Sequence, residues 1–155
     1  MNLQRYEYFV KNNFNDFEFF SEGPNGHIKK AVRFTKLTEE EPFLYNLGFG
    51  DVSETTGDID DTARRNNNDR DMVLATVART VIDFTNAHGN PYILAIGITP
   101  VRTRLYQMGI SKLWSEISVD FIVQGYVDGN WRSFEKDVNY EAFLIKRKQI
   151  GTFEI

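Results

Sequence analysis

The first third of the chain alternates between apolar and polar positions with the two-residue period of β-strands. In "FEFFSEGPNGHIKKAVRF", Phe17 and Phe19 share one face of a first strand, and Val32 and Phe34 share one face of a second. The intervening "GPNG" contains residues that tight turns favour. We therefore expect a β-hairpin, followed by a third strand at residues 43–49, where apolar residues recur at every second position.

A change to a 3.6-residue period marks a helix that ends before Gly89. Its apolar side chains between residues 73 and 84 form one stripe, which should cover a face of the sheet. Thr76 and Thr80 are placed on the opposite side of the helical wheel. Asn68 is the expected N-cap, because an asparagine side chain can accept a hydrogen bond from the first turn.

The next segment, "YILAIGI" at residues 92–98, shows no alternation. A strand that is apolar on both faces is typical of the centre of a sheet that is covered on both sides. Thr99 and Pro100 follow directly, and a threonine N-cap with proline at the first helical position is a strong signal for a helix start.

This second helix carries two apolar faces that point in nearly opposite directions. The first face consists of Val101, Leu105 and Met108. The second is formed by apolar residues between Tyr106 and Ile117. We expect a break at Gly109, with Ser111 capping a second short helix, because a straight helix would need two cores. The alternative is one helix held between two layers.

The end of the chain returns to strands. "FIVQGYV" and "WRSF" flank a turn at residues 128–130, and "NYEAFLIKRK" is partly apolar on both faces, as an internal strand would be. The expected order is β-β-β-α-β-α-β-β. It defines an α+β fold on a mostly antiparallel sheet, with two main helices, the second broken near Gly109. We expect residues 1–155 to form a single domain.

Composition narrows the class of protein. The chain has 155 residues, a net charge of −4 and no cysteine, which excludes disulfides, thiolate zinc sites and cysteine nucleophiles. It shows neither a signal-peptide pattern nor an apolar run approaching the ~20 residues of a transmembrane helix. We expect a soluble, cytoplasmic protein without membrane contact. Nucleic acid is a disfavoured partner, because the sequence has no basic stripe.

The long polar connection after residue 50 holds four candidate metal ligands, Asp51, Asp58, Asp60 and Asp61. Carboxylates bind hard cations such as Mg²⁺ and Mn²⁺, but the glycine that an EF-hand loop requires is missing. A solvated loop with Asx turns is the favoured alternative. We therefore expect no resident cofactor, and Mg²⁺ or Mn²⁺ only if the protein is an enzyme.

Two helix starts are candidate anion sites. Arg64, Arg65 and Arg70 accompany the start of the first helix, where they could hold a phosphate. Thr99 and Arg102 begin the second helix, outside the C-terminal end of the central strand. The alternative is that these arginines are ordinary polar flanks whose stems cover the edge of the core. Arg104 lies on the other side of the wheel from Arg102, and we expect it to be structural.

The sequence contains no nucleophile-elbow or zinc-protease motif. We therefore predict a non-enzymatic binding or interaction domain, for instance within a defence or mobile-element system. Its partner would be an unidentified protein or a small anionic ligand, and a homo-oligomer is compatible with the sequence. The alternative is an enzyme, with or without a metal ion, acting on a phosphorylated or nucleotide substrate.

Five segments resemble a family of uncharacterised bacterial proteins of about this length. They are "FFSEGPNGHIKKAVRF", "YNLGFGD", "NNNDRDMVLATVA", "GITPVRTRLYQMGI" and "NYEAFLIKRK". The resemblance covers nearly the whole chain and implies a complete domain. It implies no activity, cofactor or catalytic residue.

Overall fold

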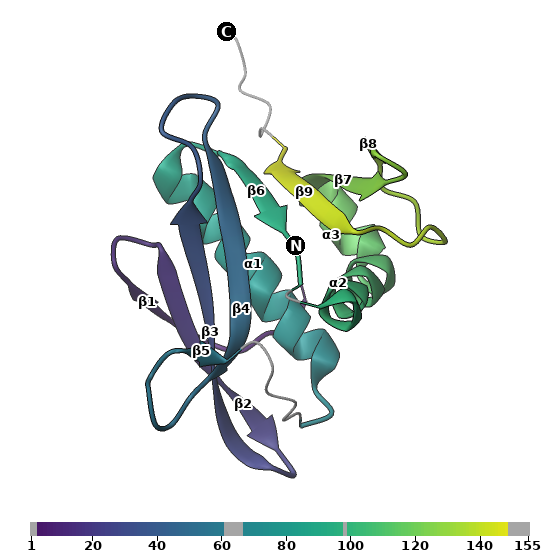
Figure 1. Cartoon of the computed structure of the whole chain (residues 1–155). Helices are drawn as coiled ribbons and strands as arrows, with labels where there is room; N and C mark the ends of the chain where they lie inside the picture. Colours follow the sequence, from purple (N-terminus) through teal and green to yellow (C-terminus); the bar gives the residue numbers. More distant parts are fainter. Residues whose placement is uncertain (1–2, 61–66, 98, 149–155) are drawn as a thin grey trace, which may run out of the picture.

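The fold is known from a computed structural model that describes residues 3–60, 67–97 and 99–148. Within them, three helices pack on one face of a nine-stranded β-sheet (Figure 1). The strands are β1 (Phe9–Lys11), β2 (Asp16–Gly23), β3 (Gly26–Lys36), β4 (Leu44–Val52), β5 (Ile59–Asp60), β6 (Tyr92–Ala95), β7 (Phe121–Val127), β8 (Asn130–Ser133) and β9 (Ala142–Arg147). The helices are α1 (Arg70–His88), α2 (Pro100–Lys112) and α3 (Trp114–Asp120). None of these helices combines the length and the hydropathy of a transmembrane segment.

The strand order is β1-β2-β3-β4-β6-β9-β7-β8, and β5 pairs with β4. Neighbouring strands are antiparallel except for β4 and β6, which are parallel and are connected through α1. The predicted α+β fold on a mostly antiparallel sheet is therefore confirmed. The sheet also contains β1 and β5. The three segments expected at the end of the chain form β7, β8 and β9, although the expected order counts only two strands after the second helix. Strands of three and two residues are too short to show a period in the sequence.

Strands β2 and β3 form the predicted hairpin. Gly23 pairs with Gly26 across the turn, and Phe17 pairs with Val32, which puts both apolar side chains on the same face. Phe17 and Val32 are completely buried. The third strand expected at residues 43–49 is confirmed as β4, and it pairs with the other side of β3.

Strand β6 lies in the middle of the sheet, as predicted, but helices cover only one of its faces. Ile93 is completely buried in the core, whereas Leu94, on the opposite face, is half-buried. On that opposite face, the ammonium group of Lys146 lies 4.3 Å from the centre of the Tyr92 ring. The expectation of a second covering layer is therefore wrong. An apolar strand can stand without such a layer, because the long stem of a lysine can shield an aromatic ring on the open face.

Helix α1 starts one residue later than its sequence indicates. Its N-cap is Asp69, which makes no capping hydrogen bond, and the predicted cap, Asn68, has a left-handed φ of 58°. The Asp69 carboxylate instead accepts hydrogen bonds from Tyr6 and Ser21. The predicted end is confirmed, because Gly89 has a φ of 77° and closes the helix.

The polar side of α1 is also covered. Thr76 and Thr80 are completely buried, although the helical wheel places them opposite the apolar stripe. The chain before β1 packs against this side, where the Tyr6 amide donates to Thr76 Oγ1 at 2.9 Å. Each threonine hydroxyl donates to a carbonyl oxygen of its own helix, 2.7 Å away for Thr76 and 2.6 Å for Thr80. Such bonds make a buried threonine acceptable inside a helix.

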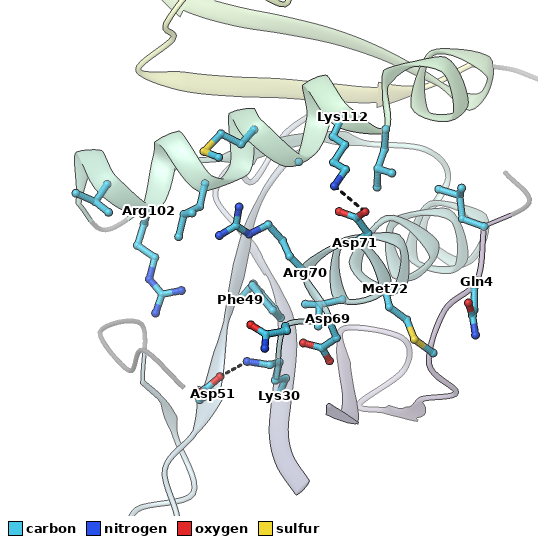
Figure 2. A pocket seen from close by; sticks show the side chains of 18 of the residues that line it. Gln4, Lys30, Phe49, Asp51, Asp69, Arg70, Asp71, Met72, Arg102 and Lys112 are labelled. Carbon is cyan, nitrogen blue, oxygen red and sulfur yellow. Dashed lines mark hydrogen bonds and ion pairs between the residues drawn. The ribbon is translucent and has the colours of Figure 1, made fainter. Parts of the chain in front are cut away.

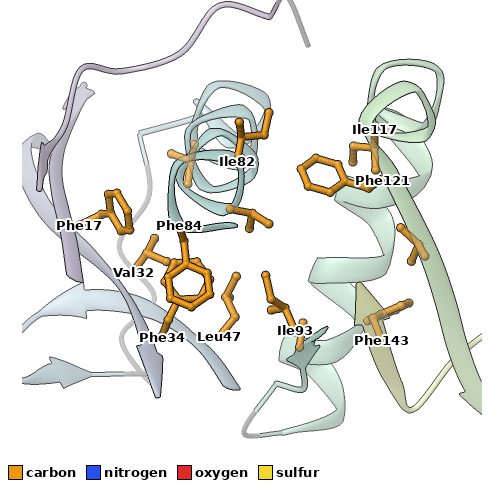
Figure 3. Close-up of a cluster of buried hydrophobic side chains, with 14 of the residues drawn as sticks. Phe17, Val32, Phe34, Leu47, Ile82, Phe84, Ile93, Ile117, Phe121 and Phe143 are labelled. Atoms are coloured by element: carbon orange, nitrogen blue, oxygen red, sulfur yellow. The ribbon is translucent and has the colours of Figure 1, made fainter. Parts of the chain in front are cut away.

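The core lies between the sheet and the helices (Figure 3). Its centre is Phe84 of α1, which stacks on Phe34 with ring centres 4.0 Å apart and meets the edge of Tyr45 at 4.8 Å. Toward the other end of the sheet, Phe143 of β9 belongs to the same buried cluster. The predicted stripe of α1 is therefore a core face.

Helix α2 passes through Gly109 without a break and ends at Lys112, and Leu113 separates it from α3. The predicted division into two helices is confirmed, but the predicted position of the break at Gly109 and the predicted cap at Ser111 are wrong. A Cβ atom on Gly109 would lie 2.3 Å from a methyl group of Leu74 in α1. The glycine therefore allows two helices to approach closely.

Only one of the two apolar faces of α2 belongs to the core. Tyr106 and Ile110 pack against the buried cluster. Val101, Leu105 and Met108, which we call the α2 stripe, line a cleft on the other side of the helix. One apolar face of α2 thus packs against the core, and the other lines the cleft.

Candidate functional site

The cleft has a volume of about 1200 Å³ and lies where the starts of α1 and α2 meet the helix-covered face of β3 and β4 (Figure 2). Charged side chains from four separate parts of the chain line it, namely Lys30, Asp51, Arg70 and Arg102. In Figure 2, Arg70 and Arg102 both point into the space between α2 and the Lys30–Asp51 pair. It is therefore the candidate functional site.

A buried ion pair forms the floor of the cleft. Lys30 of β3 and Asp51 of β4 are direct neighbours across the two strands, and they are only 7% and 4% exposed. Lys30 Nζ donates to Asp51 Oδ1 at 2.5 Å, and the ammonium group lies 6.0 Å from the centre of the Phe49 ring. Two charges inside an apolar surface are stable only as a pair, because each alone would lose its hydration without compensation.

The sequence carries a signal for this pair that our interpretation missed. In β3, the alternation places Lys30 in line with Ile28 and Val32 on the buried face. In β4, Asp51 follows Phe49 in the same way. A charged residue at an apolar position of each of two pairing strands indicates a buried ion pair, once the register of the strands is known.

A hydrogen-bonded network holds the chain that leads into α1. Asp69 Oδ2 accepts from the Tyr6 hydroxyl at 2.6 Å and from the Ser21 hydroxyl at 2.5 Å. Burial raises the pKa of Tyr6 above its usual 10.0, and the hydrogen bond to Asp69 raises it further. Tyr6 therefore stays protonated as a donor at neutral pH, and the first turn of α1 is fixed against β2.

Asn67 connects the same segment to the β2–β3 hairpin. Its amide nitrogen donates to the Ser21 hydroxyl at 3.1 Å and to the carbonyl oxygen of Gly26 at 2.9 Å, and its amide oxygen accepts from the Asn25 backbone at 2.8 Å. Asn67 is 4% exposed. A Cβ atom on Gly23 would lie 2.6 Å from the Cβ atom of Asn67, so the two segments are in close contact. The hairpin thus positions the helix start that carries Arg70.

The start of α2 forms the opposite wall. Thr99 caps the helix as predicted, accepting from the Arg102 amide at 3.2 Å. Gly97 lies under this turn, and its amide donates to the buried Thr103 hydroxyl at 2.9 Å. Arg102 lines the cleft whereas Arg104 is exposed outside it. The two arginines are therefore not equivalent.

The acidic side chains of the cleft are all engaged. Asp51 is held by Lys30, and Asp69 is held by two hydroxyl groups. Asp71, in the first turn of α1, pairs with Lys112 at 3.0 Å. Arg70 is exposed and makes no hydrogen bond or ion pair among the described residues that line this cleft. Cationic side chains outnumber acidic ones around the cleft, although the whole chain is acidic.

The predicted site residues are only partly brought together. Thr99, Arg102 and Asp51 line the cleft, whereas Arg64, Arg65 and Asp61 lie outside the described residues. Arg70, which the sequence groups with Arg64 and Arg65 as a possible phosphate ligand at the start of the first helix, also lines the cleft.

The predicted carboxylate cluster is spread over two elements. Asp51 and Asp60 pair across β4 and β5, while Asp58 lies in the exposed turn before β5. Within the described ranges, no group of three or more histidine, cysteine, aspartate or glutamate residues could hold a metal ion. A metal site that includes Asp61 stays a prediction.

The chain belongs to DUF6934, a family of unknown function whose sequence pattern matches residues 2–148. This confirms the resemblance to an uncharacterised family. No curated protein and no solved structure matches the chain. The family supplies neither an activity nor a site residue, so the function has to be argued from the cleft.

Proposed function

We propose that this member of DUF6934 is a non-enzymatic binding domain that holds a small anionic ligand in the cleft, between Arg70 and Arg102. One observation carries the proposal: two arginines from the starts of two different helices point into one cleft, in which cationic side chains outnumber carboxylates. A guanidinium group is always charged and offers its donors in a planar fork that fits phosphate or carboxylate oxygens.

The surroundings support the same ligand charge. The first turns of α1 and α2 both border the cleft, and the positive end of a helix dipole favours an anion. The Lys30–Asp51 pair contributes little net charge because its two members compensate each other. The two arginines therefore favour a ligand with a negative charge.

Titration calorimetry at about 0.15 M salt, where the Debye length is only ~8 Å, tests the proposal, with pyrophosphate as the probe. We expect Arg70→Gln and Arg102→Gln each to weaken binding about 10- to 100-fold, since a hydrogen bond to a charged group contributes ~1.5–3 kcal/mol. Arg104→Gln is the matched control, because it removes the same charge from the same helix outside the cleft. The affinity of Arg104→Gln for pyrophosphate should stay within about twofold of the wild-type affinity, because distant surface charges are screened.

Two results would contradict the proposal. The first is no heat of binding for pyrophosphate or inorganic phosphate in the wild type. The second is an equal loss of affinity in Arg102→Gln and Arg104→Gln, which would indicate attraction by overall charge only. A ³¹P spectrum of pyrophosphate that changes during incubation with the protein would favour the enzymatic alternative.

A further inference from the structure

We infer that the ligand of this cleft is amphiphilic, with an anionic group for the arginines and an apolar body that lies along the α2 stripe. The inference rests on the proposed function and extends it to the class of ligand. The α2 stripe consists of Val101, Leu105 and Met108, which recur at helical spacing on one side of α2 and all line the cleft.

The exposure of the stripe sets it apart from the core. Val101 is 60% exposed and Met108 is 47% exposed, while the opposite side of the same helix is occupied by the buried cluster. Across the cleft, Met72 of α1 and Leu3 add further apolar surface. A run of apolar side chains that faces a hollow rather than the core is typical of a ligand-binding wall.

Charge and length together define the occupant. Arg102 and the α2 stripe line the same cleft, so a charged group held by the arginines would share that cleft with the stripe. Seven residues separate Val101 from Met108, which corresponds to about 10 Å along a helix at ~1.5 Å per residue. The ligand is therefore an anion attached to an extended apolar body of about this length.

Octyl phosphate compared with inorganic phosphate tests the inference by titration calorimetry below the micellar concentration. We expect octyl phosphate to bind at least ~10-fold more tightly, since each methylene group removed from water contributes up to about fourfold in affinity. Octyltrimethylammonium, with the same chain and the opposite charge, should not bind measurably.

A double variant, Val101→Thr with Met108→Gln, locates the effect. Both positions are exposed, so the fold should tolerate the change, which circular dichroism verifies. We expect octyl phosphate affinity to fall about tenfold or more, as polar side chains replace the apolar wall, while inorganic phosphate affinity stays unchanged. Val119→Thr on α3 is the control, because Val119 is 64% exposed but does not line the cleft.

The possible results separate the two proposals. If octyl phosphate binds no more tightly than inorganic phosphate, or if the double variant binds it like the wild type, the amphiphilic ligand is refuted. Arginine-dependent binding of inorganic phosphate would in that case still support the anion site. If neither phosphate binds, the proposed function itself fails.

Discussion

Replacing Lys30 by methionine should destabilise the protein by ~3–5 kcal/mol, the usual cost of breaking a buried ion pair. Methionine keeps most of the apolar stem of lysine and removes only the charge. The change leaves the Asp51 carboxylate, which is 4% exposed, in an apolar surface without its cation. The loss therefore comes mainly from the stranded carboxylate.

The magnitude follows from two opposing terms. At the 2.5 Å separation of Lys30 Nζ and Asp51 Oδ1, the Coulomb attraction is about 7 kcal/mol for an effective dielectric constant of ~20. Removing each ion from water costs several kcal/mol, which offsets most of that attraction. Hence the intact pair contributes little net stability. Removal of Lys30 alone loses the attraction, while the cost of removing the Asp51 carboxylate from water remains.

Thermal unfolding followed by circular dichroism measures the effect. In a protein of this size, we expect the melting temperature to fall by roughly 6–20 °C. The double variant Lys30→Met with Asp51→Leu should recover most of the loss, because it replaces the pair by apolar side chains. Lys112→Met is the control: its pair with Asp71 spans 3.0 Å, but the side chains are 66% and 50% exposed. It should cost less than ~1 kcal/mol. Equal losses in Lys30→Met and Lys112→Met would refute the reasoning.

Two further predictions concern other parts of the fold. Burial and the hydrogen bond to Asp83 raise the pKa of Tyr8 to about 12 from its usual 10.0. The neutral phenol is thus favoured in the folded state, so its stabilisation is fully present below pH 10 and is lost between pH 10 and 12. The stability difference between the wild type and Tyr8→Phe in urea should shrink across that range; a constant difference would contradict the assignment. Gly97→Ala should cost ~1–3 kcal/mol, since its Cβ would lie 2.3 Å from the Thr103 amide nitrogen. Gly48→Ala is the control, with its nearest atom at 3.7 Å, and equal urea midpoints for the two variants would contradict this account.

The elements that sequence reasoning identified are those whose pattern depends on local chemistry. The hairpin around Gly23 and Gly26, the Thr99 cap and the Gly89 end each follow from the conformational preference of one or two residues. The errors arose where a distant segment decides. The helical wheel places Thr76 on the side of α1 that should be exposed. It is buried because the chain around Tyr6 packs against this side of the helix.

The two apolar faces of α2 illustrate the same limit. A helical wheel shows that Val101 and Ile110 point in different directions, but it cannot tell which direction leads to the core. The sequence suggested a break at Gly109, because one helix with two cores is not a stable arrangement. The break lies at Leu113 instead, and α2 itself keeps both faces because only the face that includes Ile110 is packed in the core.

The candidate site was predicted in part for a related reason. Arg102 could be assigned because a cap and a strand end lie beside it in the sequence. Arg70 could also be named as a candidate at a helix start, but not its place in the same cleft as Arg102, and Lys30 was missed. These positions depend on the register of β3 with β4 and on the docking of Asn67 to the hairpin. Both relations join residues that are far apart along the chain.

The parallel pairing of β4 with β6 has a consequence for folding. Leu44 pairs with Tyr92, so this contact closes a long loop that includes all of α1. Loop closure of this kind carries an entropic cost before any contact compensates it, and sheets with distant pairings form slowly. The β2–β3 hairpin forms from neighbouring residues. The cleft, in contrast, forms only after the pairing of β4 with β6, because Lys30 precedes β4 in the sequence and Arg102 follows β6. Binding energy is therefore available only to the fully folded chain, and any ligand of the cleft acts as a selective stabiliser of the native state.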